Sequence, residues 1–179
     1  MVELEDVLVE RAKVDPQAFG VLYERHVTRV YSYMYNRTGS APDAEDLTEK
    51  VFFQALTHMQ SYEGRGIPFS VWLFRIAHNL VVNWHRDNSR RRTIRLDDVD
   101  PVGEDSPDVE RQEDQAAVRK MLAKLPSDRQ NLLVLKYVNE LSNAQIGQVM
   151  GRTEGAIKAL LHRTLIALRK ELNIKENGY

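Results

Sequence analysis

The apolar residues of this chain recur every three or four positions over long stretches, the spacing of a buried stripe on an α-helix. The clearest stretch begins at Asp15 and Pro16, a capping residue followed by proline at the first helical position. Its expected end is a turn over residues 36–42, with Gly39 as the stop. Its stripe consists of Phe19, Leu22, Tyr23, His26, Val27, Val30, Tyr31 and Met34. Because no segment shows a convincing strand pattern, we predict an all-α fold.

Two further helices with the same periodicity follow. One is expected to start near Ser40–Asp43, and a glycine loop over residues 62–66 separates it from the next, which Pro68 opens. The first should turn Leu47, Val51, Ala55, Leu56 and Met59 inward. The second should carry Phe69, Trp72, Leu73, Ile76, Leu80 and Trp84 on one face. Together these elements predict one compact helical domain over residues 1–95.

Residues 96–115 break the helical pattern. Seven acidic side chains fall between residues 96 and 110, interrupted by Pro101, Gly103 and Pro107. Such a composition cannot bury an apolar face, so we expect an extended, flexible, acidic linker. Helical order resumes near Gln115 and stops at Pro126, and Ser127 is expected to cap the next helix. A second small helical domain is therefore predicted over residues 116–179.

The last third of the chain contains two short helical patterns joined by a glycine turn. Ser142 and Gln145 have the spacing of a capping box, and Gly147 is small where a second helix must cross closely. Gly151 suits the left-handed residue that ends a helix, and Thr153 can cap the following one. These features in this order are those of a helix-turn-helix, a unit that places one helix in a DNA groove. A plain helical hairpin is the alternative interpretation.

The second helix of this unit has two expected faces. The buried side should consist of Ile157, Leu160, Leu161, Leu165 and Leu168. The opposite side carries Glu154, Lys158, Ala159, His162 and Arg163. We interpret that side as the face toward a DNA groove.

The charge distribution supports a nucleic-acid partner, although the net charge of the chain is only −1. Residues 75–95 contain six basic residues and one acidic residue, and residues 118–179 contain eleven basic and five acidic residues. Between these two basic blocks, residues 96–117 contain one basic and nine acidic residues. Basic blocks of this kind are the electrostatic footprint of a nucleic-acid site.

Catalytic and metal chemistry find no support in the sequence. The chain has no cysteine, which excludes disulfides and thiolate metal sites and fits a reducing cytoplasm. The five histidines are His26, His58, His78, His85 and His162, and none lies four residues from another. There is no phosphate-binding glycine loop, serine nucleophile motif, signal peptide or long apolar run. We expect no enzyme, metal or cofactor, and no membrane insertion.

The helix opened by Pro68 has a second face of interest. Basic and polar side chains fall opposite its predicted buried stripe: Arg75, His78, Asn79, Val82, His85 and Arg86, followed by Arg90, Arg91 and Arg92. Aromatic rings lie nearby in the sequence: Tyr62, Phe69, Trp72, Phe74 and Trp84. Arginines that bind phosphates and rings that stack on bases are typical of single-strand capture. For Phe69 and Trp72 a plain core role is favoured, whereas the arginine run is interpreted as functional.

Acidic residues gather in the first turns of the preceding helix: Asp43, Glu45, Asp46 and Glu49. Acids stabilise a helix N-terminus through the helix dipole, which suffices for Asp43. With an exposed Phe52 or Phe53 and Gln54 beyond them, these acids also suggest a docking face for a basic partner.

Three motifs in this order resemble bacterial RNA polymerase sigma factors. Residues 43–56 (DAEDLTEKVFFQAL) are similar to their polymerase-docking helix, and residues 69–80 (FSVWLFRIAHNL), with the arginines that follow, to their promoter-melting helix. Leu125-Pro126 and residues 141–163 resemble their fourth region. The length, with regions one and three missing, is similar to the extracytoplasmic-function class.

The resemblance implies a protein that binds core RNA polymerase and directs it to a promoter. Its implied partners are the beta-prime clamp helices and beta flap of the polymerase, promoter DNA and a separate anti-sigma factor. The implied polymerase-binding residues are Asp43, Glu45, Asp46, Glu49, Phe52 and Gln54. The implied minus-ten residues are Tyr62, Glu63, Gly64, Arg65, Ile67, Arg75, His78, Asn79 and Arg86. The implied minus-thirty-five residues are Arg152, Thr153, Glu154, Gly155, Lys158, Ala159, His162 and Arg163.

Two other functions compete with this one. A stand-alone helix-turn-helix regulator would need a sensor or receiver domain, and the alternating strands and helices of a receiver are missing from the pattern. A purely protein-binding helical adaptor would leave the two basic blocks without a role.

Overall fold

The computed structural model describes residues 4–64, 66–94 and 122–176. Within these ranges the regular elements are helices, and no strand occurs, which confirms the predicted all-α class. The predicted acidic linker over residues 96–115 and the helix expected to resume near Gln115 lie outside the described residues, as does Arg65. None of the helices described between residues 4 and 176 is long and apolar enough to cross a membrane.

The N-terminal unit consists of α1 (Glu5–Ala12), α2 (Pro16–Thr38), α3 (Ala41–His58), a 3-10 turn η1 (Met59–Ser61) and α4 (Phe69–Ile94). The predicted helix caps and the glycine stop are confirmed. The Asp15 side chain accepts a hydrogen bond from the Gln17 amide at 2.9 Å and begins α2. Gly39 ends α2 in the left-handed conformation, with φ +67°, and Ser40 caps α3.

The core of this unit lies between α2, α3 and α4. Its fully buried side chains include Leu22, Val30, Tyr33, Met34, Leu73 and Phe74, and Leu8 and Met59 extend this core. Of the residues expected to point inward from α3, Leu47, Val51, Ala55 and Met59 are buried, but Leu56 is 50% exposed, so that prediction was wrong. Leu56 belongs instead to an outward stripe of α3 described below.

The buried stripe of α4 also differs from the prediction. Phe69, Leu73, Phe74, Ala77 and Val81 form it, whereas Trp72, Ile76, Leu80 and Trp84 are only half-buried. The helix is apolar over a wide arc because it packs on two sides: against α2 and α3 on one, and against the C-terminal unit on the other. The sequence pattern was interpreted as one buried stripe, so it could not reveal that α4 also packs against the C-terminal unit.

The C-terminal unit contains α6 (Ser127–Leu133), a π-helical turn η2 (Val134–Val138), α7 (Asn143–Met150) and α8 (Glu154–Glu176). Both halves of the predicted Ser142 and Gln145 capping box are formed, and Gly151 ends α7 with φ +66°. A Cβ atom on Gly147 would lie 2.6 Å from the carbonyl oxygen of Arg152, so the turn requires glycine there. The predicted helix-turn-helix is therefore built as its sequence indicates.

Two predictions for this unit were wrong. Ser127 does not cap α6; its hydroxyl accepts a hydrogen bond from Arg37 of the N-terminal unit instead. Leu165 is 42% exposed, and Thr164 is the buried residue at this level of α8, its hydroxyl bonded to the Leu160 carbonyl at 2.7 Å.

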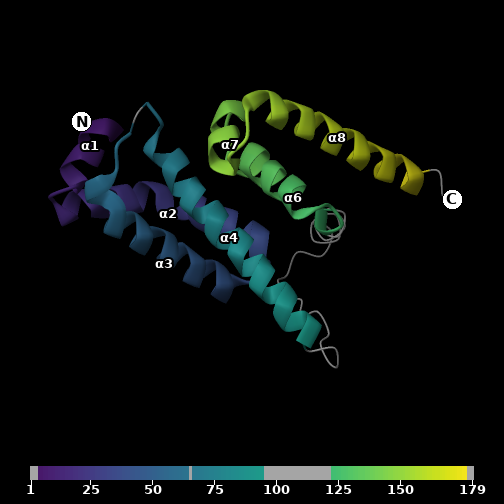
Figure 1. Ribbon diagram of the computed structural model, residues 1–179, viewed down its shortest axis with the longest axis horizontal. Coiled ribbons are helices and arrows are strands. Elements are labelled where there is room, and N and C mark those ends of the chain that lie inside the picture. The colour runs from purple at the N-terminus through teal and green to yellow at the C-terminus, as the bar shows by residue number, and fades with distance from the viewer. Residues whose placement is uncertain (1–3, 65, 95–121, 177–179) are drawn as a thin grey trace.

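The helices form stacked layers with α4 in the middle (Figure 1). On one side of α4 lie α2 and α3, and on the other lie α6 and α7. The long helix α8 runs along the outer side of the C-terminal unit, away from α2 and α3. The face of α4 opposite its own domain is thus in contact with the helix-turn-helix.

Candidate protein and nucleic-acid interfaces

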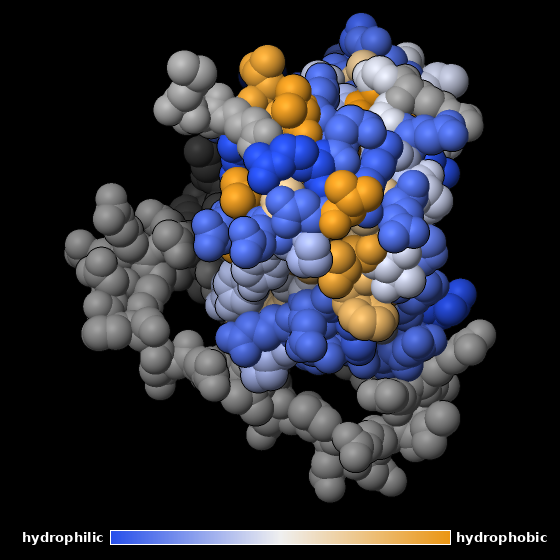
Figure 2. Space-filling model, turned by 90° about the vertical axis from the view of Figure 1, so that its left-hand side faces the viewer, coloured by the Kyte–Doolittle hydropathy of each residue, from blue (hydrophilic) through white to orange (hydrophobic). Residues whose placement is uncertain are grey.

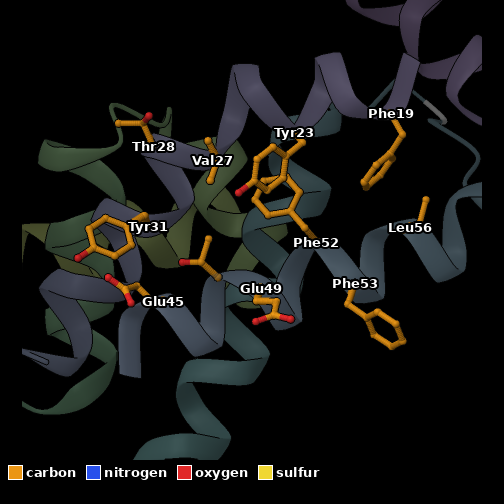
Figure 3. A pocket seen from close by; sticks show the side chains of 11 residues that line it. Phe19, Tyr23, Val27, Thr28, Tyr31, Glu45, Glu49, Phe52, Phe53 and Leu56 are labelled. Atoms are coloured by element: carbon orange, nitrogen blue, oxygen red, sulfur yellow. The ribbon is translucent and has the colours of Figure 1, made fainter. Parts of the chain in front are cut away.

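A groove of about 670 Å³ runs between α2 and α3 on the side away from α4. Rings and aliphatic side chains from both helices form its floor, and Glu45 and Glu49 stand on its α3 side (Figure 3). The residues that line it are Phe19, Tyr23, Val27, Thr28, Tyr31, Glu45, Thr48, Glu49, Phe52, Phe53 and Leu56. An apolar groove with an acidic edge can accept an amphipathic helix that carries basic residues.

The four acids at the start of α3 divide between two faces. Glu45 and Glu49 belong to the groove, whereas Asp43 and Asp46 line a separate depression shared with Trp84 of α4. Asp46 is also engaged in its own helix, because its carboxylate accepts from Lys50 at 2.6 Å. The acidic cluster that the sequence suggested as one docking face is therefore two pairs.

The sequence left open which phenylalanine of α3, Phe52 or Phe53, is exposed, and the structure distinguishes them. Phe52 is only 5% exposed and meets the edge of the Tyr23 ring with 4.7 Å between ring centroids. Phe53 is 70% exposed and points away from the helix bundle. Phe53 and Leu56 lie three positions apart on α3, a spacing that could have identified them as one exposed stripe. Gln54 lies outside this groove.

A second hollow, of about 650 Å³, lies beside the loop that leads into α4. Its walls come from the end of α3, the loop, the first turns of α4 and one residue of α7. The lining residues are Gln54, His58, Ser61, Tyr62, Glu63, Gly64, Ile67, Val71, Trp72, Arg75, Ile76 and Gln148. The hollow combines rings with polar groups from several elements, which suits a flat heteroaromatic group such as a base.

Tyr62 organises this hollow. Its ring packs against Trp72 with centroids 4.5 Å apart and meets Phe69 edge-on at 5.7 Å. Its hydroxyl donates to the Ile67 carbonyl at 3.1 Å, which closes the loop across Gly64. Burial, followed by the charges of nearby α1 acids such as Asp6, raises the pKa of Tyr62, so the hydroxyl stays a neutral donor. The loop is thus fixed in shape.

The polar side chains of α4 point in two directions. Arg75, Asn79 and Arg86 are exposed. His78 is half-buried and its Nδ1 lies 3.3 Å from the Tyr33 hydroxyl, and His85 receives Arg37 Nη2 at 3.1 Å. The predicted basic face of α4 is therefore split, because both histidines are half-buried and contact side chains of α2.

Burial governs the protonation of these two histidines. It lowers the pKa of His85 to about 4, with the adjacent Arg37 charge as a second cause, and it also lowers the pKa of His78. His85 is neutral at physiological pH and can accept the hydrogen bond from Arg37. Among the residues that the structure describes, Arg37 is the buried cation of the contact between the two units, and His85 adds no charge to it.

The candidate groove face of α8 is open. The residues predicted there are all exposed: Arg152, Thr153, Glu154, Gly155, Lys158, Ala159, His162 and Arg163. Thr153 caps the helix, as its hydroxyl accepts from the Ala156 amide at 3.2 Å. Lys158 pairs with Glu154 at 2.7 Å along the helix, and Arg152 pairs with Asp128 of α6. Figure 2 shows another face, the end of the molecule that lies on the left in Figure 1, near α1, where hydrophilic residues surround apolar patches.

The part of the chain that the structure describes holds no group of three or more His, Asp or Glu side chains arranged to bind a metal ion. His26 is buried at 6% exposure beside Phe69, and its Nε2 lies 3.5 Å from a Glu5 carboxylate oxygen. This arrangement is that of a core imidazole rather than a ligand.

Known proteins match the chain over both units. Residues 22–91 match the family Sigma-70 region 2, and residues 115–168 match Sigma-70, region 4. The chain is 30% identical to the ECF RNA polymerase sigma factor SigL of Mycobacterium tuberculosis, over 88% of this chain and 89% of that protein. It is 36% identical to the ECF RNA polymerase sigma factor BldN of Streptomyces coelicolor, over 92% of this chain but only 64% of BldN.

A solved structure shares the fold. The sigma factor RpoE of Bartonella quintana, in complex with the anti-sigma factor NepR, superposes with a TM-score of 0.71 at 20% identity. The match covers 87% of this chain and 97% of that one.

Proposed function

The chain belongs to the ECF RNA polymerase sigma factors, which direct core polymerase to promoters, and on that premise we propose how its surfaces divide this task. The α2/α3 groove binds the polymerase, the hollow beside α4 binds the unpaired minus-ten strand, and the open face of α8 binds the minus-thirty-five duplex. The chain acts by binding and positioning rather than by catalysis, and it works in the cytoplasm with polymerase and chromosome.

The groove carries the polymerase contact because it combines two features. Phe53 and Leu56 are exposed apolar side chains that a partner would remove from water. Glu45 and Glu49 give the same groove a negative charge. The partner that suits this surface is a helical hairpin with basic residues, the role of the beta-prime clamp helices. Asp43, Asp46, Phe52 and Gln54 were expected to share this contact, but their positions give them at most supporting roles.

The minus-ten strand is assigned to the aromatic hollow. A base turned out of the duplex would enter the hollow and lie against the packed rings of Tyr62 and Trp72. The exposed Arg75, Asn79 and Arg86 would hold the backbone beside it. Glu63 and Gly64 line the entrance. His78 belongs to the contact with the C-terminal unit, and we give it no direct part in this site.

The minus-thirty-five duplex is assigned to α8. Lys158, His162 and Arg163 project from one side of the helix, whose capped N-terminus suits a phosphate. Arg152 can reach phosphate only by leaving Asp128. The beta flap is proposed as the partner of the same unit, and a separate anti-sigma factor, such as the one that holds RpoE, as its regulator.

The observation that carries this function is the acidic, apolar groove, because a stand-alone helix-turn-helix regulator would have no use for it. The division of the acids gives a matched experiment. Glu49→Arg should weaken binding to immobilised core polymerase about ten-fold or more, since it reverses a charge inside the interface. Asp46→Arg makes the same change of charge one helical turn away, at a position that lines the separate depression beside α4, and should weaken binding less. Equal effects of the two variants, or none from either, would contradict the assignment.

A further inference from the structure

The hollow beside α4 has one wall whose side chains donate their hydrogens to the main chain. His58, at the end of α3, lines this wall, and its Nδ1 lies 2.8 Å from the Gln54 carbonyl oxygen. A carbonyl oxygen only accepts, so Nδ1 carries the hydrogen. In the neutral ring the other nitrogen, Nε2, is then an acceptor. His58 therefore offers a ligand in this hollow an acceptor and not a donor.

Two hydroxyl groups of the same wall are arranged in the same way. Ser61 Oγ donates to the His58 carbonyl at 2.9 Å, and Tyr62 Oη donates to the Ile67 carbonyl at 3.1 Å. Each hydroxyl has one hydrogen, so both oxygens are left with lone pairs alone for a further partner. Burial raises the pKa of Tyr62, so its hydroxyl keeps this hydrogen at physiological pH. Both groups are therefore acceptors toward a ligand.

This arrangement follows from where the wall lies in the chain. The last carbonyls of a helix lack amide partners, so side chains beyond the end of α3 can donate to them. Glu63 comes next and adds a carboxylate, which also accepts. Together His58, Ser61, Tyr62 and Glu63 form an acceptor wall. An acceptor that loses water without gaining a donor costs free energy, so this wall favours a ligand edge that carries N–H groups.

Charge decides from which side the strand backbone approaches the hollow. The α4 side carries Arg75, an exposed cation that donates and cannot accept. On the other side of the loop, α1 contributes Glu5, Asp6 and Glu10 to a separate hollow of about 550 Å³. Phosphates are attracted to Arg75 and repelled by these three carboxylates. The sugar and phosphate of a bound nucleotide therefore lie beside α4, and its base extends away from them toward the acceptor wall.

The edge of a base that lies farthest from its sugar differs among the four bases. In cytosine it carries the N4 amino group and in adenine the N6 amino group, and both are donors. In thymine and guanine the corresponding atoms are O4 and O6, and both are acceptors. Thymine or guanine would thus place a carbonyl oxygen against lone pairs with no hydrogen between them. Cytosine and adenine match the acceptor wall.

We propose that the acceptor wall selects an amino base, cytosine or adenine, at the minus-ten position whose base enters the hollow, with His58 as a specificity-determining residue. The inference rests on the proposed function for the presence of a base there. The packed rings of Tyr62 and Trp72 can stack on any base, so they set affinity, whereas the acceptor wall sets identity. Replacing the acceptor at His58 by a donor should therefore change which base is bound.

Selection from a mixed probe tests this preference. Core polymerase with the full chain would bind a DNA duplex that contains a preformed bubble, with the non-template strand randomised inside it, and the bound strands would be sequenced. We expect one bubble position to retain cytosine and adenine and to deplete thymine and guanine about ten-fold, the effect of one unmatched acceptor. Because the bubble is already open, the assay measures base capture without promoter melting.

Two lysine substitutions form a matched pair for this assay. His58→Lys replaces an acceptor of the hollow by a donor and should admit thymine and guanine at the selective position. Gln60→Lys adds a lysine two residues away, at an exposed position that does not line the hollow, and should leave the base preference unchanged. Both positions are exposed, so neither substitution removes a core side chain.

A second measurement leaves the protein unchanged. At the selective position, adenine would be replaced by purine, and cytosine by the pyrimidinone that lacks its amino group. The parent complex should bind each of these probes about ten-fold less tightly than the matching amino base. The complex with His58→Lys should lose much less affinity. Comparison of the two amino bases also shows whether a purine or a pyrimidine fills the hollow better.

The possible results distinguish the base preference from the site itself. Base preferences without any position that rejects both thymine and guanine would overturn the acceptor wall, while the minus-ten site would stand. The same conclusion follows if His58→Lys changes no preference, or if probes with and without the amino group bind equally. Bound strands with no base preference at any bubble position would contradict the proposed minus-ten site, and the inference with it.

Discussion

The two helices assigned to DNA, α4 and α8, differ in how ready they are to bind it. The polar side chains on the groove face of α8 are exposed, and the salt bridge there between Lys158 and Glu154 is one that solvent can reach. Along α4 the basic face is divided, with Arg75 exposed and His85 bonded to Arg37 inside the contact with the other unit. The comparison teaches that the polar face of α8 is wholly exposed, whereas the polar residues of α4 are divided between solvent and the contact with the other unit.

The difference follows from the side chains of each helix. The groove side of α8 is polar, so no other element gains by covering it. Around α4, half-buried Trp72, Ile76 and Trp84 extend the apolar arc beyond the stripe that packs on α2 and α3. A helix with so wide an apolar face is more stable under a neighbour, and α7 supplies one.

Removing a core side chain of the C-terminal unit should have the largest effect on stability. Leu135 of η2 is fully buried, and Leu135→Ala should lower the free energy of unfolding by about 2–5 kcal/mol. Both tryptophans of the chain, Trp72 and Trp84, lie in α4. Their emission therefore reports the N-terminal unit, whereas the substitution lies in the C-terminal unit. Urea unfolding followed by far-UV circular dichroism and by tryptophan emission should show both transitions moving to lower urea. A tryptophan signal that ignores the substitution would mean that the two units are not coupled.

Shortening a side chain on the exposed face of α8 should change binding to the minus-thirty-five element alone. Lys158→Ala should reduce binding by about 1–3 kcal/mol at one base position if Lys158 reads a base, and equally for all sequences if it touches phosphate. The check is polymerase binding to a set of promoters that vary only in the minus-thirty-five element. Lys170→Ala, an exposed lysine further along α8, is the control. A substitution at Lys158 that changes minus-ten preference instead would break the separation between the two regions.

Acid should lower the stability of the region around His78 and His85 of α4, and it should have little effect on the exposed face of α8. Burial lowers the folded-state pKa of His85 from 6.5 to about 4 and also lowers those of His78 and His26. Because the folded state favours neutral imidazole, this stability is complete above pH 6.5 and is lost as the pH falls toward 4. The charges nearest His78 and His85 are Arg37, Arg152 and Asp128, and the two arginines oppose protonation. Unfolding midpoints at pH 7 and pH 5 should therefore differ less in His85→Gln than in the parent chain, and equal differences would contradict the assignment to His85.

Much of the fold could be predicted because the residues that begin and end its helices act locally. Asp15, Gly39, Ser142 and Gly151 act within four residues of themselves, so the sequence around each is enough to interpret it. Arg37 is different, since its partners in α6 lie ninety or more positions away in the sequence. Nothing in its neighbourhood distinguishes it from an exposed arginine at a helix end.

The candidate sites follow the same division. The exposed face of α8 matched the prediction, because exposure there depends on one helix and its own periodicity. On α3, the spacing of acids could not reveal that Glu49 faces α2 while Asp46 faces α4, since that depends on where the neighbouring helices lie. The choice between Phe52 and Phe53 as the exposed ring, which the sequence left open, depends on the same neighbours.

Transcription with purified components tests the central claim most directly. Core polymerase would transcribe fragmented genomic DNA of the source organism with and without the chain, and the 5′ ends of the products would be mapped. The account predicts new start sites that share one minus-ten and one minus-thirty-five element, and their loss with Glu49→Arg. A chain that adds no start sites, yet binds duplex DNA tightly without polymerase, would contradict it and favour the helix-turn-helix regulator.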